Sequence, residues 1–187
     1  MRILNLEPDG YSVDALRILQ SYGEVVQGPM TRDDMLRTLP SVDILIVRLG
    51  HKIDREVITA GRALKVIVTA TTGLNHIDLD AAAERNIAVL SLKDEQDFLK
   101  TVHATAEHTI ALMLALVRRL PFAHQSVMSG QWERDRFKGG ELEGKTIGIL
   151  GLGRLGTKVA HYARAFGMQV VGFDTNASAA FDGVQMV

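Results

Sequence analysis

Short apolar runs alternate with amphipathic segments along the first ninety residues of the chain. The apolar runs are Arg2–Leu6, Asp43–Arg48, Lys65–Thr69 and Ile87–Leu90, and Glu24–Val26 adds an expected edge strand. Continuous Ile, Val and Leu are typical of parallel strands that are covered on both faces. Helical spacing is found in Ser12–Tyr22, Thr31–Leu39, Asp54–Ala60 and Asp78–Arg85, with Ser12 as a predicted N-cap. The alternation predicts a doubly wound parallel sheet.

A charged stretch, Lys93–Asp97, marks an expected domain junction, and a long helical segment follows from about Thr101 to Ser129. Within it, Thr109–Val117 is apolar on every face, so we expect this part to be buried on all sides. Pro121 is expected to kink or break the helix. Gly130–Gly144 is expected to form a loop.

A second β–α–β unit is predicted after this loop. It comprises a strand over Lys145–Leu150, a helix over Arg154–Phe166, a strand over Gln169–Phe173 and the start of a third strand in Asp182–Val187. The predicted fold class is therefore α/β, with two Rossmann-like doubly wound parallel-sheet domains, the second incomplete. Residues 1–97 form the first, flavodoxin-like domain, and residues 98–187 form the first part of the second.

A G-x-G-x-x-G turn, Gly151 to Gly156, joins the strand and the helix of this second unit. In a dinucleotide-binding turn the first glycine permits the tight turn, the second lets the pyrophosphate approach, and the third lets helix and strand pack closely. Asp174 ends the next strand, 18 positions after Gly156, where a carboxylate can accept hydrogen bonds from ribose hydroxyls and repel a 2′-phosphate. The pattern predicts NAD as cofactor. The candidate cofactor-binding residues in this part are Gly151, Gly153, Arg154, Leu155, Gly156 and Asp174.

The composition excludes several other classes of function. The net charge of −1 gives no electrostatic reason to expect nucleic acid or a membrane as partner. The chain has no cysteine, which excludes disulfides, thiolate catalysis and cysteine-based zinc sites. The N-terminal apolar run is too short for a signal peptide, and no run approaches the length of a membrane span, so we expect a cytoplasmic location.

The positions of the histidines in the sequence do not indicate a metal site or a catalytic histidine. His103 and His108 lie five positions apart and cannot share a ligand face on a helix, and the chain has no H-E-x-x-H motif, so we expect no metal. His108 is interpreted as a packed or capping residue of the buried helix. G-x-S-x-G and P-loop motifs are absent from the sequence.

Four segments in order resemble the D-isomer-specific 2-hydroxyacid dehydrogenases, which include phosphoglycerate dehydrogenases and glyoxylate/hydroxypyruvate reductases. Val68–Asp78 (VTATTGLNHID) is similar to the family's substrate loop, and Thr105–Leu114 (TAEHTIALML) to its interdomain helix. Gly130-Gln131-Trp132 and Glu143–Ile149 (EGKTIGI) resemble the lead-in to its nucleotide-binding strand. The resemblance implies hydride transfer between NAD and a small 2-hydroxy or 2-keto acid.

The resemblance also implies roles for individual residues. Backbone amides around Thr72, Gly73 and Leu74 would hold the substrate carboxylate, Arg48 would meet the far end of the substrate, and Thr105 would touch the cofactor. Two positions depart from the family pattern: Leu49 stands where a small hydroxyl residue is common, and Thr71 stands where glycine is common. These departures leave the identity of the acid open.

The family's catalytic Arg, Glu and His lie beyond the second strand of its nucleotide domain, so we expect no catalytic residue in this chain. Val187 is expected to mark a truncation, a proteolytic end or an incompletely determined protein, and residues 1–187 alone are expected to be inactive. The long helix and Trp132 resemble the family's subunit contact, which implies a homodimer. Two alternatives stay open: a non-catalytic, NAD-responsive binding module like the family's corepressors, and an inactive fragment.

Overall fold

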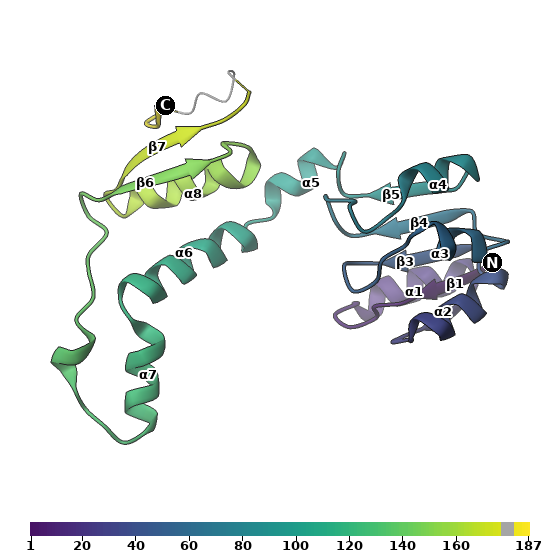
Figure 1. Ribbon diagram of the computed structural model, residues 1–187, viewed down its shortest axis with the longest axis horizontal. Coiled ribbons are helices and arrows are strands. Elements are labelled where there is room, and N and C mark those ends of the chain that lie inside the picture. Colours follow the sequence, from purple (N-terminus) through teal and green to yellow (C-terminus); the bar gives the residue numbers. More distant parts are fainter. Residues whose placement is uncertain (177–181) are drawn as a thin grey trace. The chain divides into compact units, whose positions relative to one another are not determined.

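The computed structural model describes residues 1–176 and 182–187, which form two compact units, Met1–Leu99 and Lys100–Val187 (Figure 1). The strands of unit 1 are β1 (Arg2–Asn5), β2 (Glu24–Gln27), β3 (Ile44–Val47), β4 (Val66–Thr69) and β5 (Ala88–Ser91). All pairings are parallel, in the order β2-β1-β3-β4-β5, so the predicted edge strand lies at the edge. This is the flavodoxin-like order of a doubly wound sheet.

Side-chain caps begin four of the helices in this part of the chain. The helices are α1 (Val13–Tyr22), α2 (Arg32–Thr38), the 3-10 turn η1 (Leu39–Ser41), α3 (Arg55–Ala60), α4 (Leu79–Glu84) and α5 (Gln96–Thr101). Ser12, Thr31, Asp54 and Asp78 each accept a hydrogen bond from the amide three residues ahead. Each cap satisfies a donor that the first helical turn leaves unpaired.

The main core of unit 1 lies between the sheet and α2, α3 and α4. Leu4, Leu45 and Ile67 from the strands are fully buried there, together with Val57 and Ile58 of α3. Helix α1 contributes no buried residue, although its apolar positions follow a helical repeat. The central strands β1 and β3 also bury Ile3 and Ile46 on the opposite face of the sheet, so both of their faces are covered.

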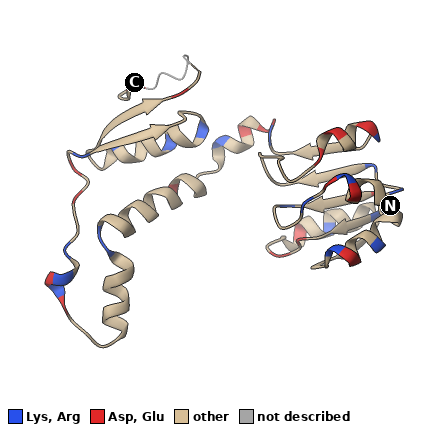
Figure 2. Cartoon of the chain, in the orientation of Figure 1, with Lys and Arg blue, Asp and Glu red and all other residues tan. Residues whose placement is uncertain are grey.

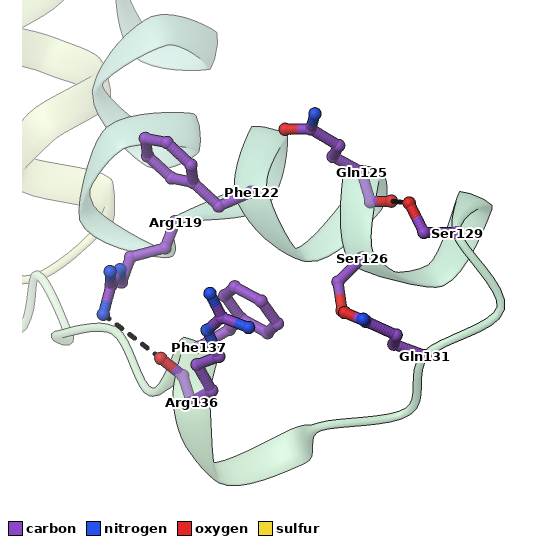
Figure 3. A pocket seen from close by; sticks show the side chains of 8 residues that line it. All are labelled: Arg119, Phe122, Gln125, Ser126, Ser129, Gln131, Arg136 and Phe137. Carbon is purple, nitrogen blue, oxygen red and sulfur yellow. Dashed lines mark hydrogen bonds between the residues drawn. The ribbon is translucent and has the colours of Figure 1, made fainter.

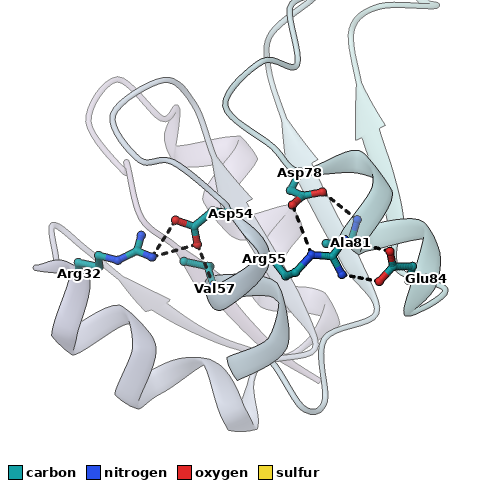
Figure 4. A network of polar contacts seen from close by, with 7 residues as sticks. All are labelled: Arg32, Asp54, Arg55, Val57, Asp78, Ala81 and Glu84. Atoms are coloured by element: carbon teal, nitrogen blue, oxygen red, sulfur yellow. Dashed lines mark hydrogen bonds and ion pairs between the residues drawn. The ribbon is translucent and has the colours of Figure 1, made fainter.

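A chain of ion pairs joins the three core-covering helices at their ends (Figure 4). Arg32 of α2 contacts Asp54, the N-cap of α3, at 2.8 Å. Arg55 of α3 binds Glu84 of α4 through two contacts and lies 4.0 Å from Asp78, the N-cap of α4. The Arg32 guanidinium holds the pKa of Asp54 below its usual range, and Arg55 does the same for Glu84.

Unit 2 contains a second parallel sheet. Its elements are α6 (Ala104–Val117), α7 (Leu120–Met128), the 3-10 turn η2 (Arg134–Phe137), β6 (Thr146–Leu150), α8 (Arg154–Ala165), β7 (Gln169–Phe173) and β8 (Gln185–Met186). The strand order is β6-β7-β8. Helix α8 packs on β6 and β7, and α6 packs on α8, so that Ala106 and Ile110 are buried against Val159, Ala160 and Ala163.

The predicted long helix Thr101–Ser129 is wrong as a single element. It is two helices, α6 and α7, and the expected break near Pro121 falls at Arg118 and Arg119, where Arg119 adopts a left-handed φ of 55°. Pro121 lies in the first turn of α7 and has no N–H for the carbonyl of Val117. Gly140 donates to that carbonyl instead, at 3.0 Å, and so ties the following loop to the end of α6.

The prediction that α6 is buried on all sides is also wrong. Leu112 and Leu116 are 59% and 76% exposed, because α8 covers the helix on the side of Ala106 and Ile110 and leaves these two side chains uncovered. His108 is exposed and not packed, although His103 is the N-cap residue of α6. Figure 2 shows how little charge α6 and α7 carry: Glu107 is the one acidic or basic residue within their bounds.

One smaller difference concerns the loop before β6. The expected loop Gly130–Gly144 contains the turn η2. Among residues 1–176 and 182–187, no helix has the length and apolarity required to cross a membrane.

Candidate functional site

The three glycines of the turn after β6 have three different physical reasons to be glycine. Gly151 has φ +93°, a backbone conformation that side chains with a Cβ rarely adopt. A Cβ on Gly156 would lie 1.9 Å from the carbonyl oxygen of Gly151, so only glycine permits α8 to approach the turn. Gly153 has an ordinary φ of −71°, and a Cβ there would meet nothing within 4 Å. The open space above Gly153 is therefore room for something other than the chain.

Unpaired amides face that turn from the start of α8. Gly153 is the N-cap and has no side chain to accept from the first helical turn. In the part of the chain that the structure describes, the amides of Leu155 and Gly156 donate no hydrogen bond. Such amides, together with the positive end of the helix dipole, form a site for a phosphate group. Arg154, the first helical residue, adds a positive charge to the same turn.

Asp174 lies beside the turn because β7 runs parallel to β6 and ends next to it. The amide of Leu152 donates to Asp174 Oδ2 at 2.6 Å, and the amide of Asn176 donates to Oδ1 at 2.8 Å. These two bonds fix the half-buried carboxylate at the carboxyl edge of the sheet. Each carboxylate oxygen keeps a further lone pair, so the group can still accept hydrogen bonds from a vicinal diol.

The donor set at this edge fits a dinucleotide: unpaired helix amides and a cation for the diphosphate, open space at Gly153, and a fixed carboxylate for a ribose. Thr105 lies in the first turn of α6, is exposed, and uses its carbonyl to accept from Thr109. Within residues 1–176 and 182–187 it forms no hydrogen bond with the turn, so its predicted contact with the cofactor stays a prediction.

A second set of unpaired amides lies in unit 1, in the loop after β4. Within the described residues, the amides of Thr72, Gly73 and Leu74 donate no hydrogen bond. They line a pocket of about 590 Å³ together with Lys93, whose ammonium group is unpaired in the same described part, and with the acids Asp78 and Asp80. Three consecutive amides at the carboxyl end of a parallel strand can hold a carboxylate.

Gly73 is not required by the fold of this loop. Its φ is not positive, and an added Cβ would meet nothing within 4 Å. Its backbone conformation is therefore one that any residue could adopt. Space in front of the amides is the property that glycine preserves.

Arg48 lies at the end of β3 and lines a different pocket of about 460 Å³, together with Tyr11, Thr69 and Phe98. Its side chain contacts the carbonyl of Asp9 at 3.4 Å. Burial raises the pKa of Tyr11, an effect that the nearby Arg48 charge opposes. Arg48 and the amides of residues 72–74 thus share one edge of the sheet but line separate pockets.

Glu7 is a residue of this edge that the sequence did not reveal. Its carboxylate accepts hydrogen bonds from the amide of Arg48 at 2.7 Å and from the amide of Gly50 at 3.2 Å, which holds the loop after β3. The signal that could have found it is its position: an acid directly after the first strand, in a sheet whose neighbouring strand is β3.

A further pocket, of about 350 Å³, lies between α7 and η2 and includes no residue of either candidate site (Figure 3). The guanidinium groups of Arg119 and Arg136 stack on the rings of Phe122 and Phe137, and Arg119 donates to the carbonyl of Arg136 at 3.2 Å. The hydrogen bond from Arg119 to Arg136 joins η2 to the start of α7, whereas each cation–π contact lies within one of the two elements.

A glycine turn between a parallel strand and a helix, followed by a strand that ends in an acid, defines the class of Rossmann-type dinucleotide-binding domains. The family comparison is more specific. Residues 110–187 match the family described as D-isomer specific 2-hydroxyacid dehydrogenase, NAD binding domain.

Curated and solved relatives agree with that family. The chain is 42% identical to a D-3-phosphoglycerate dehydrogenase of Methanocaldococcus jannaschii over 90% of its own length and 32% of that protein. It is 38% identical to a hydroxypyruvate reductase of Thermotoga maritima, over 81% of this chain and 48% of that one. A crystal structure of D-lactate dehydrogenase from Aquifex aeolicus complexed with NAD and lactic acid matches with a TM-score of 0.82 and 25% identity, over all of this chain and 56% of that one. The chain spans about a third of the phosphoglycerate dehydrogenase and about half of the other two.

Proposed function

We propose that this chain supplies the NAD-binding and substrate-binding parts of an oxidoreductase that acts on a small 2-hydroxy or 2-keto acid. The observation that carries the proposal is the glycine turn, where Gly153 leaves open space beside unpaired helix amides while Asp174 is fixed next to them. The family match over residues 110–187 supports the same cofactor.

In this proposal residues 98–187 bind the cofactor. The amides of Gly153, Leu155 and Gly156 hold the diphosphate with Arg154, and Asp174 binds the adenosine ribose and disfavours a 2′-phosphate. Thr105 contacts the cofactor from α6. The nicotinamide supplies the hydride-accepting or hydride-donating carbon when NAD is bound.

Residues 1–97 bind the acid. The amides of Thr72, Gly73 and Leu74 donate hydrogen bonds to its carboxylate, and Lys93 adds positive charge to that pocket. Arg48 meets the far end of the substrate. We assign no residue of this chain to proton transfer or to polarising the carbonyl, so residues 1–187 alone are proposed to bind both ligands without turnover.

We also propose that two copies associate through α6, α7 and the segment that carries Trp132. Leu116 and Trp132 are 76% and 84% exposed, and α6 and α7 carry a single charged residue, Glu107. Large exposed apolar side chains on an almost uncharged surface are typical of a protein–protein contact.

Fluorescence titration with NADH, and in parallel with NADPH, tests the cofactor. We expect NADH to bind and NADPH to bind more weakly; saturation by neither would reject the cofactor proposal. Incubation of the chain with NADH and hydroxypyruvate, glyoxylate or 3-phosphohydroxypyruvate tests whether residues 1–187 alone lack turnover. Consumption of NADH would show that proton-transfer residues are present after all. Binding of NADH coupled to the capture of a peptide partner would instead favour a corepressor-like module.

A further inference from the structure

The loop after β4 is braced by three side chains to which the proposed function gives no role. Thr69 is buried at the end of the strand, and its Oγ1 lies 3.0 Å from Thr71 Oγ1 and 3.4 Å from His76 Nε2. Thr71 Oγ1 in turn donates to the carbonyl oxygen of Gly73 at 2.8 Å. The side chains therefore form a continuous chain from His76 to the backbone of Gly73.

Counting hydrogens fixes the direction of this chain. A threonine hydroxyl has one hydrogen, and Thr71 gives its hydrogen to Gly73, so Thr71 Oγ1 accepts from Thr69. Thr69 then has no hydrogen left for the imidazole and must accept from it. His76 consequently carries a hydrogen on Nε2, which is true of one neutral tautomer and of the protonated ring.

The chain ends on the carbonyl of Gly73, which belongs to the same peptide unit as the unpaired Leu74 amide. In a trans peptide the C=O and the following N–H point in opposite directions, so holding the Gly73 oxygen toward Thr71 turns the Leu74 amide the other way. The Leu74 side chain packs on the core, and its carbonyl accepts from the amide of Ile77 at 2.9 Å. The segment from Gly73 to Leu74 is thereby fixed on both sides.

We propose that Thr71, Thr69 and His76 are positioning residues that pre-orient the amides of residues 72–74 to receive a carboxylate. This inference rests on the proposed substrate role of the loop. Thr71 is the decisive member, because glycine, common here in the family pattern, supplies no hydroxyl to hold the Gly73 carbonyl. Amides that are already aligned lose less conformational entropy when the anion binds. This chain therefore combines the open space that Gly73 leaves in front of the amides with a brace two residues earlier.

The test uses the 187-residue chain labelled with ¹⁵N, in wild-type form and as Thr71→Ala, Thr71→Ser and Thr69→Val. Backbone relaxation of residues 72–74 is measured without ligand, and the amide shifts are then followed during titration with glycolate at constant ionic strength, with chloride as the reference anion. We expect Thr71→Ala and Thr69→Val to loosen residues 72–74 and to weaken glycolate binding about three- to tenfold. Thr71→Ser keeps the hydroxyl and should restore both properties.

The possible outcomes distinguish the brace formed by Thr71, Thr69 and His76 from the substrate-binding role of the loop. Amides of residues 72–74 that stay as rigid in Thr71→Ala as in the wild type would overturn the brace, whatever glycolate does. Equal glycolate affinity in Thr71→Ala and wild type would overturn it as well. Wild-type amides that are rigid but do not respond to glycolate would reject the substrate role of the loop, while the comparison of rigidity between variants still decides the brace. Thermal unfolding of all four proteins identifies a variant that has lost its fold.

Discussion

Asp174 at the end of β7 and Leu152 in the glycine turn are joined by a hydrogen bond of 2.6 Å from the Leu152 amide to Asp174 Oδ2. The bond fixes a carboxylate beside the opening at Gly153, at the place where two parallel strands end together. One side chain thus supports the conformation of the turn and presents acceptors to a ligand.

Replacing Asp174 by alanine is expected to weaken NADH binding about 10- to 100-fold, because hydrogen bonds to a charged group contribute about 1.5–3 kcal/mol. NADPH should lose less, since the charge that repels a 2′-phosphate is removed with the side chain. Fluorescence titration with both cofactors measures the change in preference. Asp182→Ala, at an exposed acid of the same unit, is the control. An unchanged ratio of the two affinities in Asp174→Ala would contradict the ribose-binding role.

Substitutions can distinguish the structural role of Gly156 from the cofactor-binding role of Gly153. Gly156→Ala is expected to destabilise unit 2 by about 2 kcal/mol, because its Cβ would lie 1.9 Å from the Gly151 carbonyl oxygen. Gly153→Ala meets no atom of the chain and should leave the melting temperature nearly unchanged while NADH affinity falls. Circular dichroism melts and NADH titrations on the two variants provide the comparison. Full NADH affinity in Gly153→Ala would show that the open space is not occupied by the cofactor.

Elements defined by local signals were predicted well from the sequence. Ser12 caps α1 as expected, and Gln169–Phe173 is a strand over the predicted residues, because capping and alternation of apolar residues depend on neighbours in the sequence. The burial of α6 was mispredicted, because an apolar helix face is buried only if another element covers it. Here α8 covers one side and leaves Leu116 exposed.

In the candidate sites too, features set by local sequence could be predicted, whereas contacts between distant residues could not. The glycine pattern and the acid after β7 can be read directly from the sequence, since their spacing follows from one β–α–β unit. Glu7 could not be assigned in this way, because it binds the amide of a residue 41 positions away. Thr71 was noticed as a departure from the family pattern, but its partners Thr69 and Gly73 became clear only from the hydrogen bonds.

Unit 1 is expected to lose stability in acid. The pKa values of Asp54 and Glu84 are lowered by Arg32 and Arg55 in the folded chain, so the ion pairs stabilise the fold above the unfolded pKa values of these acids. This contribution is constant near neutral pH and is lost as the pH falls through about 4 toward the lower, folded pKa values.

Urea unfolding followed through the NMR signals of β3 measures this effect at several pH values. The urea midpoint should fall between about pH 5 and pH 3, and the fall should shrink at high salt because the pairs are exposed. Glu84→Gln should reduce the pH dependence, whereas Asp33→Asn, at an exposed acid for which the described residues show no ion pair, serves as the control. Identical pH dependence in the two variants would remove the Arg55–Glu84 pair as its source.

Self-association through the apolar surface of α6 and α7 is the last expectation. Leu116 and Trp132 lie in unit 2 and are exposed, and the transfer of such side chains from water is favourable by about 25 cal/mol per Å² of buried apolar area. Sedimentation velocity at several concentrations should therefore detect a dimer. Leu116→Glu and Trp132→Ala should both shift it toward the monomer, the first more strongly because it places a charge in the contact. Tyr22→Glu, on the exposed face of α1, is the matched control. A dimer that resists the two unit 2 substitutions but dissociates in Tyr22→Glu would move the contact to unit 1.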